Sequence, residues 1–166
     1  MLFQYRQNSK APLLNWDIFC TNYNNLLEDA GRYHESLTEL KNMARQNKWS
    51  KLQTKQAIAN FEKYVIVITD TKQLISFTSV GFEQMTGYTS AEVYGRNPNF
   101  LQGSSTSKYS GQSVKNEVDG IQQSEAIIEN YRKNGELYLC KIIIQPVINI
   151  NQKLVNYIAY EQEVAA

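Results

Sequence analysis

The fold is decided by one stretch of the sequence, YVIVITDTKQLISFT at residues 64–78. Its first six residues are all β-branched or aromatic, which is typical of a buried strand. Residues 70–73 form a polar turn, and residues 74–78 form a second short apolar segment. Two short strands joined by four polar residues predict a β-hairpin.

Short helical signals follow this hairpin. Residues 79–86 favour a helix that ends at Gly87, because glycine adopts the left-handed backbone of a helix C-terminus at low cost. The run Thr89-Ser90-Ala91-Glu92 is typical of a capping box, and Gly95 closes the short helix that it begins. Residues 103–120 are rich in Ser, Gly and Gln, and we expect at most one short helix there.

The rest of the chain is extended. A strand that includes Ile127 and Ile128 leads to Asn134-Gly135, a dipeptide typical of tight hairpin turns. Two further strands are expected at 137–147 and 154–164. Two strands, then short helices, then three strands predict an α+β domain. Its core is a five-stranded antiparallel sheet with short helices on one face.

The residues before the hairpin have a helical period. Apolar side chains recur at spacings of 4, 3, 4, 3 and 4 residues, which is the heptad-like rhythm of one helix stripe. We expect helices at 15–46 and 51–62, with Ser50 able to cap the second. The chain then divides into an N-terminal helical extension, residues 1–62, and a domain at 63–166. The stripe consists of Leu26, Ala30, Tyr33, Leu37, Leu40 and Ala44.

Composition narrows the class of protein. Of the 166 residues 42% are apolar and 20% are charged, which is enough apolar material for a folded core. Lys and Arg total 17 against 16 for Asp and Glu, and a net charge of +1 argues against a nucleic-acid partner. No run of about 18 apolar residues is present, so we expect no membrane span.

Cysteine and histidine are scarce. Cys20 and Cys140 lie far apart in the sequence, which gives no disulfide framework and favours a reducing, cytoplasmic location. His34 is the only histidine, so a metal site or a catalytic triad has few candidate residues. We therefore expect neither a metal site nor an enzyme.

Five motifs, in this order and at these spacings, resemble the PAS domain family over about residues 63–164. The similarity is greatest to the flavin-binding LOV branch, whose signature is Gly-Arg-Asn-x-x-Phe-Leu-Gln-Gly. This resemblance implies the PAS fold and a sensory role. The motifs are VITD at 67–70, VGFEQMTGY at 80–88, EVYGRN at 92–97, NFLQG at 99–103 and NYRKNG at 130–135.

The flavin chemistry of the LOV branch carries over only in part. The family's reactive cysteine falls at Pro98, which has no nucleophile, so the resemblance implies no flavin–thiol adduct here. The arginine that pairs with the flavin phosphate falls at Asn99, which is neutral. The cofactor therefore stays unidentified. Flavin is open but disfavoured, and haem is not expected, since His34 lies outside the PAS segment.

The resemblance also implies five candidate cofactor-binding residues. Asn97 and Gln102 match positions that bind the ribityl chain, although both side chains could equally satisfy backbone groups. Asn130 matches a position that reads the flavin ring. The next such asparagine falls at Cys140, which we interpret first as a small apolar strand residue. The family's last glutamine falls at Glu161, or at Gln162 if the strand register shifts by one.

The N-terminal stripe has two possible uses, packing on the domain's own sheet or forming a dimer seam. A helix of about 30 residues extends roughly 45 Å, longer than a small domain is wide, so part of it should need a partner. The resemblance adds that PAS domains commonly pair through N-terminal helices. We therefore expect a homodimer.

These observations predict a stand-alone PAS sensory module. It would bind a small ligand or a partner protein and signal through a helical dimer interface. No output domain is evident in the sequence, so a kinase or regulator would be a separate chain. The alternative is a flavin-binding redox or light sensor that works without the cysteinyl adduct.

Overall fold

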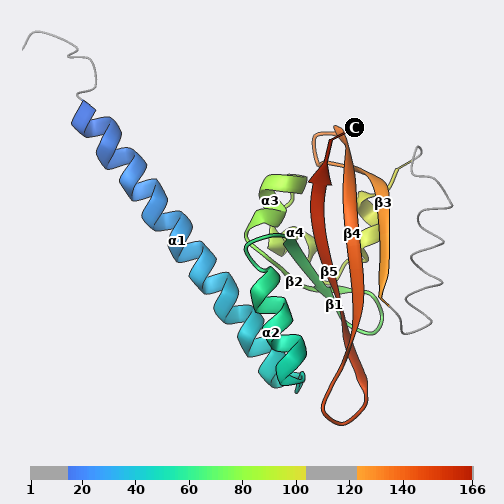
Figure 1. The fold of residues 1–166 in the computed structure, drawn as a ribbon. Coiled ribbons are helices and arrows are strands. Elements are labelled where there is room, and N and C mark those ends of the chain that lie inside the picture. Colours follow the sequence, from blue (N-terminus) through green and yellow to red (C-terminus); the bar gives the residue numbers. More distant parts are fainter. Residues whose placement is uncertain (1–14, 104–122, 166) are drawn as a thin grey trace, which may run out of the picture.

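The computed structural model describes residues 15–103 and 123–165. Its elements follow the predicted order (Figure 1). The expected helix within 103–120 lies outside the described residues, apart from Gly103. The elements are α1 (Asn15–Gln46), α2 (Lys51–Asn60), β1 (Val65–Thr69), β2 (Ile75–Thr78), α3 (Gly81–Thr86), α4 (Ser90–Val93), the 3-10 helix η1 (Pro98–Leu101), β3 (Ser124–Tyr131), β4 (Leu137–Ile148) and β5 (Leu154–Val164).

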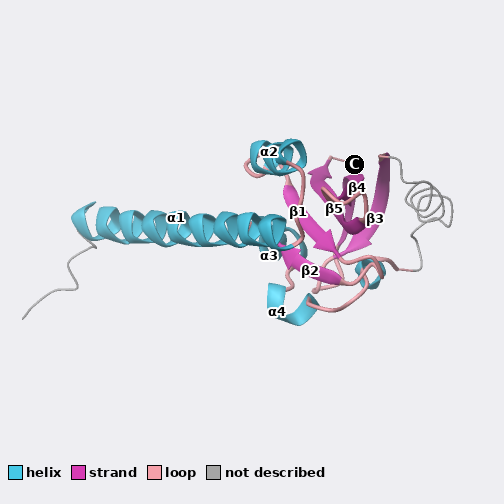
Figure 2. Cartoon of the chain, turned by 90° about the horizontal axis from the view of Figure 1, so that it is seen from below, coloured by secondary structure: helices cyan, strands magenta, loops and turns pink. Residues whose placement is uncertain are grey.

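The strands form one antiparallel sheet in the order β2-β1-β5-β4-β3 (Figure 2). The last strand, β5, is therefore central, between β1 of the first hairpin and β4 of the last. The predicted five-stranded antiparallel sheet, with short helices on one face and a helical segment before it, is confirmed. Helix α2 ends at Asn60 and not at residue 62, because Phe61 donates its N–H to Ile58 three residues back (3.2 Å) and tightens the last turn.

The sheet has two differently covered faces. The helix face packs against α1 and α2, and its core includes Ile66, Ile158 and Tyr160. The pocket face packs against α3, α4 and η1, and it includes Val67 of β1. Alternation along β5 assigns Tyr160 to the helix face and Glu161 to the pocket face. The register left open by the sequence is thus settled: Glu161 points inward and Gln162 is exposed.

Two local motifs hold the short helices in place. Thr89 and Glu92 form the predicted capping box, in which the Thr89 N–H donates to the Glu92 carboxylate (2.9 Å). Gly87 ends α3 with φ of 77°, as the sequence predicted for this position. The N–H of Lys133 then donates to the Thr86 carbonyl (2.8 Å), which ties α3 to the β3–β4 turn.

Helix α1 is packed at one end only. Leu40 and Ala44, in its C-terminal half, are buried in the core on the helix face. The N-terminal half extends away from the sheet (Figure 1). Its large apolar side chains are 48–64% exposed, namely Ile18, Phe19, Tyr23, Leu26 and Leu27.

The α1–α2 junction is hydrogen-bonded to β5, the central strand. The Trp49 indole N–H donates to Oδ1 of Asn156 (3.0 Å), and the Asn47 amide donates to the same oxygen (2.8 Å). Asn156 in turn donates to the Thr69 carbonyl (3.0 Å). These bonds fix the position of the helices on the sheet. Within residues 15–103 and 123–165, no helix has the length and apolar character needed to cross a membrane.

Candidate functional site

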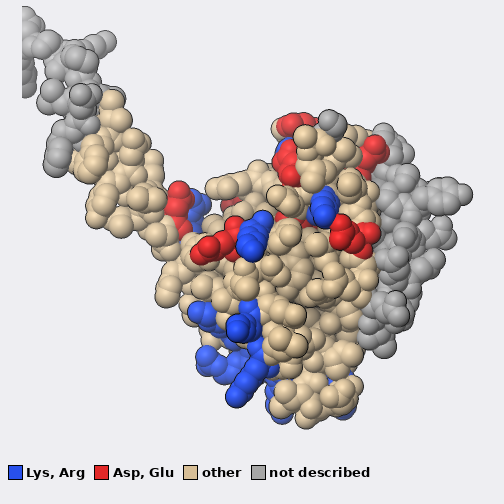
Figure 3. Space-filling model, viewed as in Figure 1, with Lys and Arg blue, Asp and Glu red and all other residues tan. Residues whose placement is uncertain are grey.

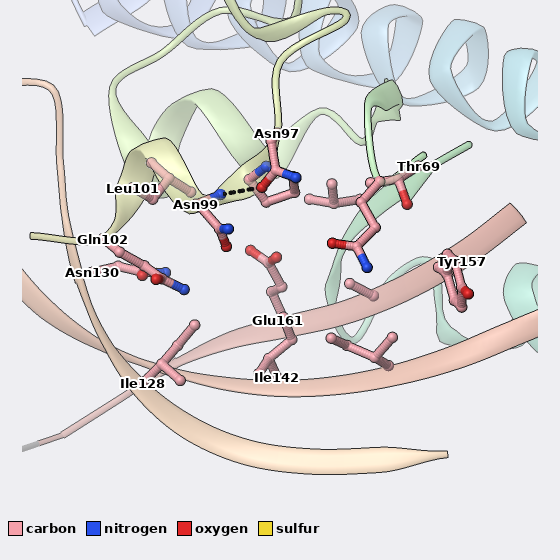
Figure 4. A pocket seen from close by; sticks show the side chains of 15 residues that line it. Thr69, Asn97, Asn99, Leu101, Gln102, Ile128, Asn130, Ile142, Tyr157 and Glu161 are labelled. Carbon is pink, nitrogen blue, oxygen red and sulfur yellow. Dashed lines mark hydrogen bonds between the residues drawn. The ribbon is translucent and has the colours of Figure 1, made fainter. Parts of the chain in front are cut away.

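A cavity of about 110 Å³ lies between the pocket face of the sheet and the segment 97–102. Most of its wall is apolar, and polar side chains enter from the segment 97–102 and from the strands (Figure 4). The apolar wall is formed by Val67, Leu101, Ile128, Ile142, Ile144 and Ala159. The polar lining is Thr69, Gln73, Asn97, Asn99, Gln102, Asn130, Tyr157 and Glu161.

The segment 97–102 is shaped by its own sequence. Oδ1 of Asn97 accepts the backbone N–H of Asn99 (3.0 Å) and so caps η1, and Pro98 follows at the first position of that helix. Asn97 therefore has a structural bond and also lines the cavity. Gln102 ends the helix and lines the cavity as well. Pro98 borders the cavity with a ring that carries no nucleophile.

Glu161 is the unusual group in this site. It is only 4% exposed, and its Oε2 has no hydrogen-bond partner among the described residues. Figure 4 shows its carboxyl pointing toward η1, with the Asn99 side chain descending toward it from the opposite wall. Burial raises the pKa of this carboxyl to about 7, because removal from water disfavours the charged form.

Asn130 also carries an unpartnered oxygen atom. The residue is buried on β3, and its Oδ1 accepts no hydrogen bond from the residues that the structure describes. No Lys, Arg or His lines the described part of the cavity. On the face seen in Figure 3, the basic side chains lie on the surface and gather mostly over α2. The site therefore combines apolar walls with unpartnered oxygen atoms and supplies no cation of its own.

Cys140 lies beside the cavity but is not among the residues that line it. Its side chain packs with Met85, Ile128 and Tyr138 in an apolar cluster. Burial raises the pKa of the thiol, so it stays protonated and a poor nucleophile at neutral pH. The structure thus brings together four of the five candidate residues, Asn97, Gln102, Asn130 and Glu161, and places Cys140 behind the wall.

Four polar residues of this site, Thr69, Gln73, Asn99 and Tyr157, were not among the candidates from the sequence. Thr69 and Tyr157 line the cavity, and period-2 alternation from Val67 and from Glu161 could have found them. Asn99 was considered only for the arginine that it replaces, yet it also lines the cavity. Among residues 15–103 and 123–165, no three His, Cys, Asp or Glu side chains gather as a metal site would require.

Known proteins are similar to this chain in sequence. A blue-light photoreceptor of Listeria innocua serovar 6a is 34% identical over 98 residues, which are 57% of this chain and 39% of the relative. Phototropin-1A of Oryza sativa subsp. japonica is 36% identical over 118 residues, 66% of this chain and 12% of the relative. The chain thus spans well under half the length of these relatives.

Solved structures of LOV domains are similar to this chain as well. A light-oxygen-voltage domain studied with a flavin analogue has a TM-score of 0.63 and 27% identity, covering 70% of this chain and 87% of that one. The dark structure of the aureochrome1 LOV domain has a TM-score of 0.62 and 25% identity, covering 70% and 84%. The family model of the PAS domain matches residues 63–165. The chain therefore belongs to the PAS domain family, and its sequence and structural relatives are LOV photoreceptors and LOV domains.

Proposed function

We propose that this protein is a sensory PAS module that binds a small molecule in the cavity between η1 and the sheet. The buried Glu161 carboxyl with its unpartnered Oε2 carries the proposal. A buried polar atom without a partner costs on the order of 1–3 kcal/mol, and a ligand that supplied the missing hydrogen bond would recover it. The apolar walls would bury the body of that ligand.

Strand β5 offers a route from the cavity to the helices. Glu161 faces the cavity, while Asn156 of the same strand accepts hydrogen bonds from Asn47 and Trp49 at the α1–α2 junction. A ligand that favours one position of β5 would therefore favour one arrangement of α1 and α2. The signal would be a shift in the population of two helix arrangements.

The exposed half of α1 is the proposed output surface. Its apolar residues continue the stripe that packs on the helix face, and a stripe of this period fits a second helix. A second copy of this chain supplies such a helix with matching rhythm, so we propose a homodimer. A separate kinase or regulator would be the alternative partner. Some relatives are described as blue-light-activated histidine kinases, for example that of Brucella canis, which is 33% identical over 90 residues.

A second candidate is a flavin-dependent light or redox sensor without a cysteinyl adduct. The blue-light relatives favour it, as do Asn97, Gln102 and Asn130 in the cavity. Pro98 and the acidic Glu161 count against it, because the first removes the thiol and the second faces the bound ring with a carboxyl. The cavity of about 110 Å³ is also below the range of about 300–1,000 Å³ that is usual for larger ligands.

An absorption spectrum of the purified protein, with mass spectrometry of the supernatant after denaturation, tests both candidates. The proposal predicts a released small molecule without a flavin band near about 450 nm. Ala159→Leu, which adds carbon atoms inside the cavity, should lose that molecule, whereas Ala165→Leu, at an exposed position, should keep it. A flavin band would establish the second candidate, and an empty supernatant would contradict both.

A further inference from the structure

The chemistry of the cavity restricts its ligand. Glu161 sits on the central strand between Val65 of β1 and Ile142 of β4, both apolar. Neither neighbouring residue can donate a hydrogen bond from its side chain. When ionised, a carboxylate accepts hydrogen bonds and donates none, so Oε2 needs an N–H or O–H. Among the described residues, neither a strand neighbour nor an amide or hydroxyl of the cavity lining donates to it.

The described residues also supply no positive charge to this carboxyl. On the adjoining strand β4, burial raises the pKa of Tyr138 and of Cys140, so both are uncharged near neutral pH. Lys141 of β4 lies on the opposite face of the strand from Ile142 and pairs with Glu125 (2.7 Å). Arg132 and Glu163, near the ends of these strands, pair with each other at 2.6 Å. A buried carboxylate left without a counter-charge is costly, and a cationic partner removes that cost.

Size and shape set the remaining limits. An engineered apolar cavity of about 150 Å³ takes up one benzene molecule. This smaller, partly open cavity of about 110 Å³ therefore takes at most a single ring, part of which extends through its opening. Leu101 on one side and Ile128 and Ile142 on the other offer apolar walls for the ring (Figure 4). The N–H edge of the ring would then face Glu161.

The geometry points to a small flat nitrogen base, bound as its cation, with two N–H groups donating to the carboxylate of Glu161. Aromatic amidines and aminopyridines belong to this class, because their planar N–H edge matches a carboxylate in a two-point, charge-assisted hydrogen bond. The inference rests on the proposed function, since it names the ligand class of the same cavity. Anions are excluded by the same charge.

Titration calorimetry on the full chain with three matched probes tests this ligand class. Benzamidine is the cation, benzamide the neutral analogue and benzoate the anion, all on the same ring. We expect benzamidine to bind at least tenfold more tightly than benzamide, and benzoate not to bind. Glu161→Gln keeps the shape and removes the charge, so it should weaken benzamidine at least tenfold and leave benzamide nearly unchanged.

Two further variants and a pH series support this measurement. Glu125→Gln removes an exposed carboxyl that pairs with Lys141, and it should leave all three affinities unchanged. Glu161→Asp retracts the carboxyl and should weaken benzamidine by less than the Gln variant does. Because burial raises the pKa of Glu161 to about 7, benzamidine affinity should fall as pH falls below about 7, with proton release on binding. The Gln variant should lose this pH dependence.

The outcomes separate the ligand class from the proposed function. Benzamide or benzoate binding more tightly than benzamidine would overturn the cation inference and leave a ligand-binding cavity. Unchanged benzamidine affinity in Glu161→Gln would overturn it as well. If no probe binds but the denatured supernatant contains a small molecule, the ligand class is wrong and the proposed function stands. If no probe binds and the supernatant is empty, both are wrong.

Discussion

The two faces of the central sheet are both apolar, but only one of them is filled. On the helix face, side chains from α1, α2 and four strands close into one cluster that includes Leu40, Trp49 and Tyr160. On the pocket face, the walls stand apart and leave a partly open cavity of about 110 Å³. Two consecutive residues of β5, Tyr160 and Glu161, point into these two environments.

The two faces also differ in whether their buried polar side chains have hydrogen-bond partners. On the helix face the indole of Trp49 and the amide of Asn156 are bonded to each other, and Asn156 is further bonded to Thr69. On the pocket face, Oδ1 of Asn130 and Oε2 of Glu161 have no hydrogen-bond partner in the described part of the chain. The close packing and paired polar groups of the helix face stabilise the fold. The cavity and unpaired oxygens of the pocket face reduce stability, and a ligand that binds there can recover part of that cost.

The largest effect on stability is expected from a substitution in the core of the helix face. Trp49→Ala removes a buried ring and leaves Asn156 without its indole donor, so we expect the free energy of unfolding to fall by about 3–5 kcal/mol. Leu52→Ala, at a side chain that is 66% exposed on α2, should change it by about 0.5 kcal/mol or less. Urea denaturation of both variants measures the difference. Equal effects would mean that α1 and α2 contribute little to the stability of the sheet.

The next largest effect is the pH dependence of the free energy of unfolding, which Glu161 on the pocket face causes. Burial raises the pKa of Glu161 from 4.5 to about 7, so the folded state keeps a proton that the unfolded chain has already released between these values. The contribution of Glu161 to stability is therefore fully present below pH 4.5 and is lost as pH rises through about 7, a change of about 3 kcal/mol. Glu161→Gln has no proton to lose.

Denaturation of the wild-type protein and of Glu161→Gln at two pH values measures this change. At about pH 8 the variant should be more stable than the wild type by about 3 kcal/mol, relative to their difference at about pH 4. Other titrating groups are common to both proteins and cancel in the comparison. A difference that does not vary with pH would show that Glu161 is solvated or already paired, and the pocket face would lose its distinguishing feature.

The order of the elements could be predicted because it depends on local signals. β-branched runs, the capping box at Thr89 and the glycine at Gly87 each act within a few residues, and each is found where it was expected. The cap of η1 at Asn97 is equally local, since Asn followed by Pro is typical of a helix start. The sequence had left the Asn97 side chain open between a bond to the backbone and a place in the ligand site. The PAS fold followed from this order together with the family motifs.

The candidate site was harder to predict because it depends on register and on sheet curvature. A shift of one residue in β5 would have exchanged Glu161 and Gln162, and only pairing with β1 and β4 fixes the choice. Cys140 lies on the same face of its strand as Ile142, yet only Ile142 lines the cavity. How far the cavity extends along β4 depends on packing between residues that are distant in the sequence. A local sequence pattern therefore cannot predict it.

The smallest expected effect on stability is at the exposed half of α1. The stripe has the same period at Leu26 and at Leu37, so sequence alone could not tell which half is covered. In the structure Leu37 packs on the helix-face core and Leu26 is exposed. Leu26→Asp should therefore change the free energy of unfolding of the PAS domain by about 0.5 kcal/mol or less, whereas Leu37→Asp should destabilise it clearly.

The same variant tests the proposed homodimer, because light scattering reports mass independently of stability. If α1 pairs with a second copy, Leu26→Asp places two carboxylates in the helix seam and should convert a dimer into a monomer that remains folded. Glu28→Gln, on a polar face of the same helix turn, should leave the dimer unchanged. A wild-type monomer would contradict self-association, and the exposed stripe would then need a different protein as its partner. A dimer that survives Leu26→Asp would place the contact elsewhere on the domain, and α1 would lose its role as the output surface.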